Sequence, residues 1–278
     1  MFKTILSAFC LAAAIAAPVL ADETYSIHEK QYVGHQERFA LLYTYKVKST
    51  STTGGKSTVT DTDESESWKM TQTVLAESNG SATRLRVEFD PDSVDTTKNA
   101  GGPPTKTPCP FIGKTIVLRM HPDNSITNDF QGSASDDDLN YLNGILIPDD
   151  DFFPDKPVAA GDTWDNTAKY ARHAGEGPKD KLASRCKLDW VKTIGGKQMA
   201  QISVAVAVIN YEDGNVEEDN EWTSTSLVDL AAGEIVKCDC RGSSKYITPP
   251  SEATQVTGGT EFTFHAEAIP DAQPTTKP

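Results

Sequence analysis

The stretch ILIPDDDFFPDKPVAAGDTW, residues 145–164, separates two similar runs of strand-like sequence. Its prolines lack the amide proton that a sheet interior needs, and each disfavours helical backbone before it; they are Pro148, Pro154 and Pro157. Gly161 and Asp162 favour a turn, after which Trp164 begins a strand. We predict a proline-rich connector at 148–160 between a first meander at 38–147 and a second at 161–268.

Residues 1–21 have the features of an export signal. Lys3 is positively charged, an apolar stretch follows, and small residues precede a cleavage site after Ala21. Phe9 lies where a lipobox needs a small residue, so Cys10 is not expected to carry lipid. The exported chain, periplasmic or extracellular, then has an N-terminal arm at 22–37 and a flexible tail at 269–278. It has no stretch of about 18 to 20 apolar residues, so no integral membrane segment is predicted.

The formal net charge of −14 becomes −15 without the signal, because Lys3 is the only charged residue removed. An acidic surface opposes binding to nucleic acid and to anionic lipid headgroups. We therefore predict no nucleic-acid partner. The simpler interpretation of this charge is a well-solvated surface.

Four cysteines remain after the signal: Cys109, Cys186, Cys238 and Cys240. An even number in an oxidising compartment predicts disulfides. Residues 238 and 240 are two apart on a strand, about 6.5 to 7 Å between Cα atoms, which is at or beyond the reach of an unstrained bridge. Each is thus expected to pair with Cys109 or Cys186, unless only one bridge forms. A four-thiolate zinc site is the alternative, but the cysteines lack its usual paired spacing, and no metal is predicted.

Apolar residues alternate with polar ones along most of the chain, which predicts half-buried antiparallel strands. Two hairpins stand out, at 68–89 around Asn79-Gly80 and at 186–208 around Gly195-Gly196. Each is followed by a further turn, at 123–124 and at 232–233. This shared order predicts an internal repeat, although any antiparallel protein shows turns at similar intervals.

Other segments are predicted from composition. The Ser- and Thr-rich residues 49–67 are expected to form an exposed hairpin loop or two ragged edge strands. Loops are predicted at 91–110 and 248–259, and a strand at 164–171. One short helix is predicted near residues 136–143, because Ser135 is a good N-cap and three aspartates favour the first turn. The aspartates are alternatively a cation site, which capping makes unnecessary.

Four tryptophans either line a ligand cavity or fill the core. They are Trp68, Trp164, Trp190 and Trp222. Each lies beside aliphatic residues at a strand period, and core filling is therefore the preferred prediction.

No catalytic motif is present in the sequence. It has no Gly-x-Ser-x-Gly elbow, no His-Glu-x-x-His and no glycine loop for phosphate or dinucleotide. Asp61 and Asp63 begin like a calcium loop, but Glu66 stands where glycine is needed. The histidines at 121, 173 and 265 are isolated. No catalytic residue and no cofactor is predicted, and the ligand-binding residues stay unknown.

One phrase of the connector carries a resemblance. The pattern Pro…Pro-Val…Gly-Asp-Ser/Thr-Trp is met here at Pro154, Pro157, Val158, Gly161, Asp162, Thr163 and Trp164. It resembles an uncharacterised family of secreted bacterial all-β proteins, a domain of unknown function, and implies no activity. The strand order is also similar to the half-barrels that carry lipoproteins in the periplasm, although no motif supports that similarity.

These observations predict an all-β, antiparallel fold with two similar meander halves forming curved sheets or half-barrels. The predicted function is a non-enzymatic binding or envelope-associated carrier module that uses a concave apolar sheet face. The expected partner is an apolar ligand or another envelope protein. The alternatives are a secreted hydrolase with a carboxylate pair, and a purely structural or protein-interaction role.

Overall fold

A computed structural model describes residues 23–123, 125–145, 152–171, 181–212, 216–248 and 254–269. The predicted signal at 1–21 and nearly all of the predicted tail lie outside these residues.

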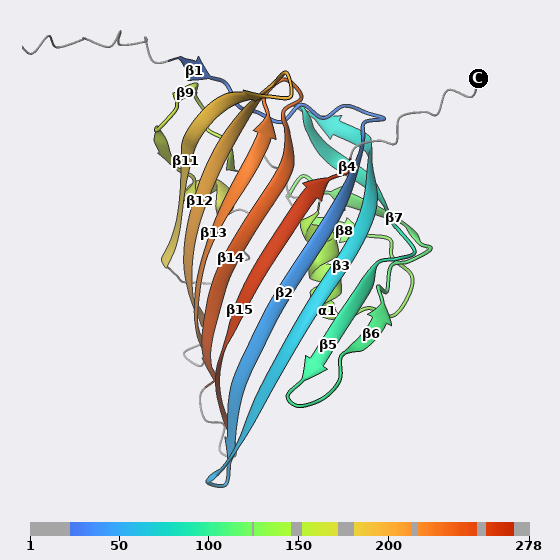
Figure 1. Cartoon of the computed structure of the whole chain (residues 1–278), viewed down its shortest axis with the longest axis vertical. Helices are drawn as coiled ribbons and strands as arrows, with labels where there is room; N and C mark the ends of the chain where they lie inside the picture. The colour runs from blue at the N-terminus through green and yellow to red at the C-terminus, as the bar shows by residue number, and fades with distance from the viewer. Residues whose placement is uncertain are drawn as a thin grey trace, which may run out of the picture.

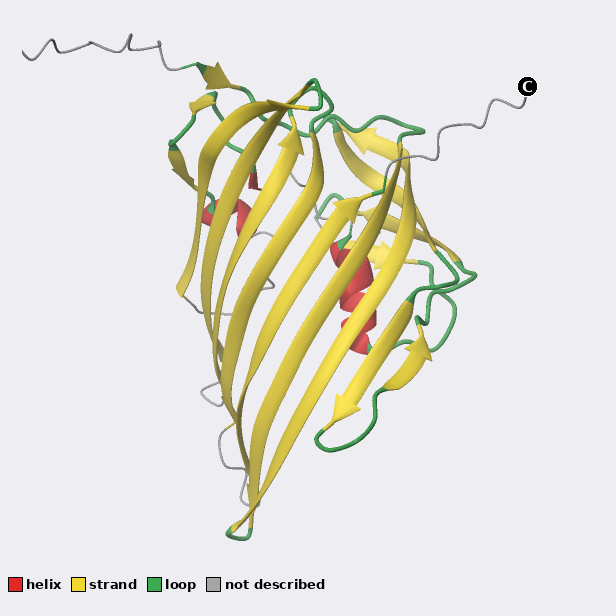
Figure 2. Cartoon of the chain, viewed as in Figure 1, coloured by secondary structure: helices red, strands yellow, loops and turns green. Residues whose placement is uncertain are grey.

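The chain forms one large antiparallel sheet, curved but not closed into a barrel (Figures 1 and 2). The predicted all-β fold is thereby confirmed. Along the sheet the strands are β10 (Thr163–Asp165), β11 (Lys181–Ile194), β12 (Lys197–Glu212), β13 (Val216–Asp229), β14 (Glu234–Thr248), β15 (Thr254–Ala268), β2 (Gln36–Thr53), β3 (Lys56–Ser78), β4 (Ser81–Phe89), β7 (Thr115–Met120) and β8 (Ile126–Asn128). Strand β5 (Val94–Asn99) pairs with β3 and with β6 (Thr105–Pro108).

The two predicted halves belong to a single sheet. The last strand, β15, pairs with β2 along its whole length, from Thr254 opposite Thr53 to Ala268 opposite Phe39. This β15–β2 pairing, and not the connector, joins the two halves in space. In sequence the connector lies between β8 and β10, which are the strands at the two opposite edges of the sheet. Both halves are meanders, and their origin by duplication stays a prediction.

Both predicted hairpin turns are confirmed. Asn79 and Gly80 have φ angles of 55° and 87°, and Gly195 and Gly196 have 57° and 84°. Left-handed backbone at both central residues is the geometry that matches the right-handed twist of hairpin strands. These turns connect β3 to β4 and β11 to β12.

Two segments predicted as loops form strands instead, and residues 49–67 take the second of their two predicted forms, a pair of strands rather than an exposed loop. Residues 49–67 extend β2 and β3, which pair with each other down to Thr53 and Lys56. Their backbone groups are hydrogen-bonded within the sheet, so the strands can form even though the polar Thr and Ser side chains are exposed to water. Threonine also favours extended backbone. Within 91–110, β5 and β6 form a hairpin, and Thr254–Gly259 belongs to β15.

The predicted helix is confirmed as α1 (Asp136–Gly144). Ser135 caps it, with its hydroxyl accepting from the Asp138 amide and the Asp138 carboxylate accepting from the Ser135 amide. A second helix, α2 (Thr167–Tyr170), replaces half of the strand predicted at 164–171. The Asp165 carboxylate accepts a 2.8 Å hydrogen bond from the Thr167 amide, which turns the chain away after β10.

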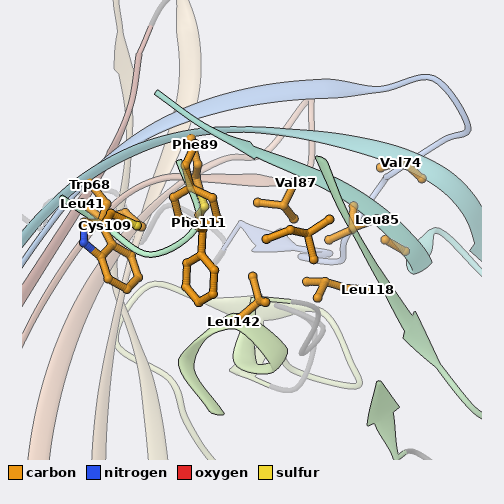
Figure 3. Close-up of a cluster of buried hydrophobic side chains, with 13 residues drawn as sticks. Leu41, Trp68, Val74, Leu85, Val87, Phe89, Cys109, Phe111, Leu118 and Leu142 are labelled. Atoms are coloured by element: carbon orange, nitrogen blue, oxygen red, sulfur yellow. The ribbon is translucent and has the colours of Figure 1, made fainter. Parts of the chain in front are cut away.

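Apolar side chains of the concave face form two separate clusters. The first, in β2 to β7, is covered by α1, and Figure 3 shows Leu142 of that helix reaching toward Phe111 and Leu118. The second, in β11 to β13, is covered by Phe153 and by residues packed around it. Beside it, β1 (Thr24–Tyr25) and β9 (Val158–Ala159) form a two-stranded sheet.

Candidate functional site

A groove of about 460 Å³ lies on the concave face between the two clusters. Its first wall comes from the first half of the chain and includes Phe39, Leu41 and Met70. Its second wall comes from the second half and includes Val204, Trp222 and Ile235. Both walls are apolar, and their residues belong to or pack against the two clusters.

Small side chains leave the floor of the groove hollow. Ser226 pairs across the strands with Cys238, which pairs with Ala266, and Ser224 pairs with Cys240. All five line the groove. Protein interiors are closely packed, and a run of small residues between bulky ones therefore leaves space unless another segment fills it. The groove arises from this change of side-chain size along one sheet face.

The N-terminal arm crosses one end of the sheet (Figure 1). We call residues 27–35 of this arm the strap. Lys30 Nζ donates to the carbonyl oxygens of Leu230 (3.1 Å) and Ala231 (3.2 Å), at the turn between β13 and β14. The backbone N–H of Gln31 donates to Gly80 O (2.7 Å) at the turn between β3 and β4. The strap thus links both halves of the chain and places Glu29 and Gln31 at the end of the groove.

Two glycines permit this close approach. A Cβ atom at Gly80 would lie 2.9 Å from the Glu29 carbonyl oxygen, and one at Gly233 would lie 2.5 Å from that of His28. Both glycines also have positive φ angles, of 87° and 74°. A side chain at either position would displace the strap.

The tryptophans do not share one role, which corrects the prediction that all fill the core. Trp68 is 2% exposed and does fill the first cluster. Trp164 packs against the second cluster and donates to Phe152 O (3.2 Å). Trp222 instead lines the groove, against the ring of Tyr170 at 5.9 Å. Trp190 is half-buried, with Lys192 Nζ 4.6 Å from its ring centre.

The predicted disulfides are wrong for this structure. Cys109 belongs to the first cluster and Cys186 to the second, while Cys238 and Cys240 are on β14 in the groove floor. No two of the four lie at bonding distance. Burial raises the pKa of the Cys109, Cys186 and Cys240 thiols to about 12 each. Three protonated thiols in separate places are unsuited to nucleophilic attack and to a shared zinc ion.

The histidines that the sequence singled out remain apart. His121 contacts Thr127 at 2.8 Å, His265 contacts Asp239 at 2.7 Å, and residue 173 lies outside the described part of the chain. Sequence reasoning missed a different one, His35 of the strap. It contacts Glu37 and Glu234, which are on different strands. The spacing His-x-Glu at the start of a strand, where extended backbone can place two side chains on one face, was the available signal.

One carboxyl group, Asp95, stands out electrostatically. Burial raises its pKa, although a 2.6 Å hydrogen bond from Trp68 Nε1 opposes this rise. Among the described carboxyl groups with a resolved shift, it alone has a raised pKa. Its partner is an indole rather than a second acid.

The Gly-Asp-Thr-Trp phrase of the connector has a local structural role. Gly161 has a φ angle of 95°, and the Asp162 carboxylate accepts from the Ala159 amide at 2.8 Å. The Leu188 amide donates to Asp162 O (3.0 Å), which holds the turn against β11. The phrase therefore builds the start of β10 rather than a chemical site.

In the described part of the chain, no helix combines the length and apolar character needed to cross a bilayer.

No family model and no curated protein matches the sequence. Among solved structures, one of lipovitellin, titled for its lipid–protein interactions, matches with a TM-score of 0.38 at 9% identity. The match covers 85% of this chain and 26% of lipovitellin, so the chain spans about a quarter of that protein. A DUF1329 family protein from Desulfovibrio piger matches with a TM-score of 0.15 at 8% identity, over 84% of this chain and 86% of that one. Both likenesses are too distant to place the chain in a family.

Proposed function

We propose that this chain is a non-enzymatic, exported binding protein that carries an apolar or amphipathic small molecule in its groove. The observation that carries this proposal is the 460 Å³ hollow between two well-packed clusters. Ligand pockets typically have volumes of about 300 to 1,000 Å³ and mainly apolar walls. Export rests on the features of residues 1–21.

The strap end of the groove favours a ligand with a polar end that donates hydrogen bonds. Glu29, Gln31 and Glu37 line this end and offer oxygen acceptors. Gln31 Oε1 is buried and accepts no hydrogen bond from a described residue. An unsatisfied buried acceptor costs about 1 to 3 kcal/mol, and a ligand hydroxyl or amine there would remove that cost.

The test is binding of a neutral apolar dye, N-phenyl-1-naphthylamine, to the purified chain, followed by its fluorescence. Ser224→Leu fills the floor of the groove and should weaken binding at least tenfold. Thr225→Leu is the matched control, because this half-buried neighbour on β13 faces the opposite side of the sheet. It should bind the dye as the unchanged chain does.

Two outcomes would contradict the proposal. One is the lack of saturable dye binding to the unchanged chain, which would favour a structural or protein-interaction role. The other is an equal loss in Ser224→Leu and Thr225→Leu. The alternative of a hydrolase has less support, because Asp95, whose pKa burial raises, bonds to Trp68 instead of a second carboxyl group.

A further inference from the structure

His35, Glu37 and Glu234 converge at the strap end of the sheet. His35 Nε2 lies 3.3 Å from Glu37 Oε1 and 3.1 Å from Glu234 Oε1. The three side chains are largely buried, with 11%, 15% and 23% of their surfaces exposed. One nitrogen therefore faces two carboxylate oxygens in a place where water has little access.

The hydrogen-bond geometry leaves His35 Nε2 unsatisfied. The atom is buried, and despite the two nearby oxygens it makes no well-formed hydrogen bond. An imidazole nitrogen carries at most one proton, which points in one direction. A hydrogen bond therefore cannot account for both close carboxylates, whereas a cation among the three atoms satisfies all of them.

The spacing of the three donors fits a metal ion. All three donor atoms lie within 4.8 Å of one another. Bonds of about 2.0 to 2.2 Å from one ion place neighbouring ligands about 3.0 to 3.5 Å apart in tetrahedral or octahedral geometry. The two nitrogen–oxygen distances fall in that range, and the two carboxylate oxygens lie within 4.8 Å of each other.

The donor types narrow the choice of ion. An imidazole nitrogen is a poor ligand for Mg²⁺ or Ca²⁺, which prefer oxygen, and it suits Zn²⁺ and neighbouring transition metals. Two carboxylates and a neutral imidazole carry a charge of about −2, which balances a divalent ion. We propose that His35, Glu37 and Glu234 bind a divalent transition-metal ion such as Zn²⁺.

The position of the site indicates what the ion would do. Glu37 is on β2 and Glu234 begins β14, and β15 lies between these strands. The β14–β15 pairing ends at Lys237 opposite Glu267, and the β15–β2 pairing ends at Ala268 opposite Phe39. Beyond the end of β15 the ion would join β14 to β2 directly, and it would fix the strap where it enters the sheet.

His265 provides a matched comparison, because it also contacts two carboxylates. Its Nδ1 lies 2.7 Å from Asp239 and its Nε2 lies 3.6 Å from Glu267. These contacts involve opposite ring nitrogens, so one ion cannot bind the ring and both carboxylates. Its side chain is also 36% exposed. This histidine should make no contribution to metal binding.

The experiment is calorimetric titration of the chelator-treated full chain with Zn²⁺. We expect one saturable site, not displaced by excess Mg²⁺ or Ca²⁺, with affinity at least tenfold lower in His35→Gln and in Glu234→Gln. His265→Gln should bind as the unchanged chain does. Because an ion bound to the native state stabilises it, Zn²⁺ should also raise the unfolding temperature of the unchanged chain but not that of His35→Gln.

Cysteine ligation is the competing explanation, and Co²⁺ distinguishes it. Cobalt held by nitrogen and oxygen should show visible absorption bands without the ultraviolet charge-transfer band of a thiolate. A thiolate band, unchanged binding in both His35→Gln and Glu234→Gln, or the lack of saturable binding would each overturn the proposal. These results are independent of the dye experiment when that experiment is carried out on the chelator-treated chain.

Discussion

Two regions of the same sheet face differ in how completely they are buried. In the first cluster, Phe111 and Leu118 have no exposed surface. In the groove, Phe264 and Trp222 are only half-buried, although they also lie on the concave face. What differs is the cover: α1 packs over the first cluster, whereas the middle keeps a hollow among the described residues.

This difference shows that the sheet does not itself decide between core and binding surface. The same alternation of side chains lines both regions. Segments distant in sequence, such as α1 over the first cluster and Phe153 over the second, convert parts of the face into core. The small residues of the groove floor, including Ala266 and Ser224, keep the rest hollow.

The sharpest test of this comparison replaces one phenylalanine in each region. Phe111→Ala should lower the free energy of unfolding by about 3 to 5 kcal/mol, because it removes buried surface and also leaves a cavity. Phe264→Ala should cost less than about 3 kcal/mol, because the groove already provides open space and only the transfer of apolar surface is lost. Urea denaturation measures both values.

The comparison depends on Phe111→Ala losing more unfolding free energy than Phe264→Ala. If Phe264→Ala destabilises as much as Phe111→Ala, the groove is part of the packed core, and the comparison fails. Equal denaturant slopes for the two variants are required, because a changed slope would signal a changed unfolded or native state rather than lost packing.

A second prediction concerns the turn on which the strap rests. Asp229 is 2% exposed, and its carboxylate accepts from Lys197 Nζ (2.6 Å) and from the amides of Ala231 (3.0 Å) and Ala232 (3.2 Å). Burial acts to raise its pKa, but these hydrogen bonds outweigh burial, and the pKa is lowered. Asp229→Asn should lower the free energy of unfolding by about 2 kcal/mol at neutral pH.

The pH dependence follows from the sign of that shift. A carboxyl group with a lowered folded-state pKa stabilises the fold above its unfolded pKa of about 3.9, and this contribution is lost as the pH falls through the folded-state value. The unchanged chain and Asp229→Asn should therefore converge in stability below about pH 4. Asp239→Asn is the control, because its 56% exposed carboxylate should contribute less than about 1 kcal/mol. A constant difference at all pH values would contradict this account.

Local signals in the sequence predicted much of the fold. The Asn79-Gly80 turn and the Ser135 cap depend on neighbouring residues only, and both form as expected. For residues 49–67 the sequence left open a hairpin loop or two edge strands, because the backbone of residues 49–53 is satisfied by pairing with β15, more than 200 residues away in sequence. Composition indicates which segments have side chains exposed to water, but it does not indicate whether their backbone is hydrogen-bonded to another strand.

The site was less predictable for the same reason. Alternation predicts which side chains share a face, but not which of them a distant segment covers, so Trp222 was assigned to the core. The disulfide prediction used the number and sequence spacing of the cysteines, which do not show where the fold places them. Cys109 and Cys186 lie in separate clusters. Glu234 meets His35 only because the strap crosses the end of the sheet.

The smallest expected effect tests the cover of the first cluster. Ser135→Ala removes the hydroxyl that accepts the Asp138 amide at 3.1 Å and should cost about 1 kcal/mol. Ser133→Ala, at an exposed position just before the helix, should change stability by less than about 0.5 kcal/mol.

If α1 is an integral part of the first cluster, the loss appears in global unfolding measured by urea. If α1 instead opens by itself, its amide hydrogens exchange faster while global stability is unchanged. The second result would mean that the first cluster can open as the groove does, and that the two regions differ in degree of cover rather than in kind.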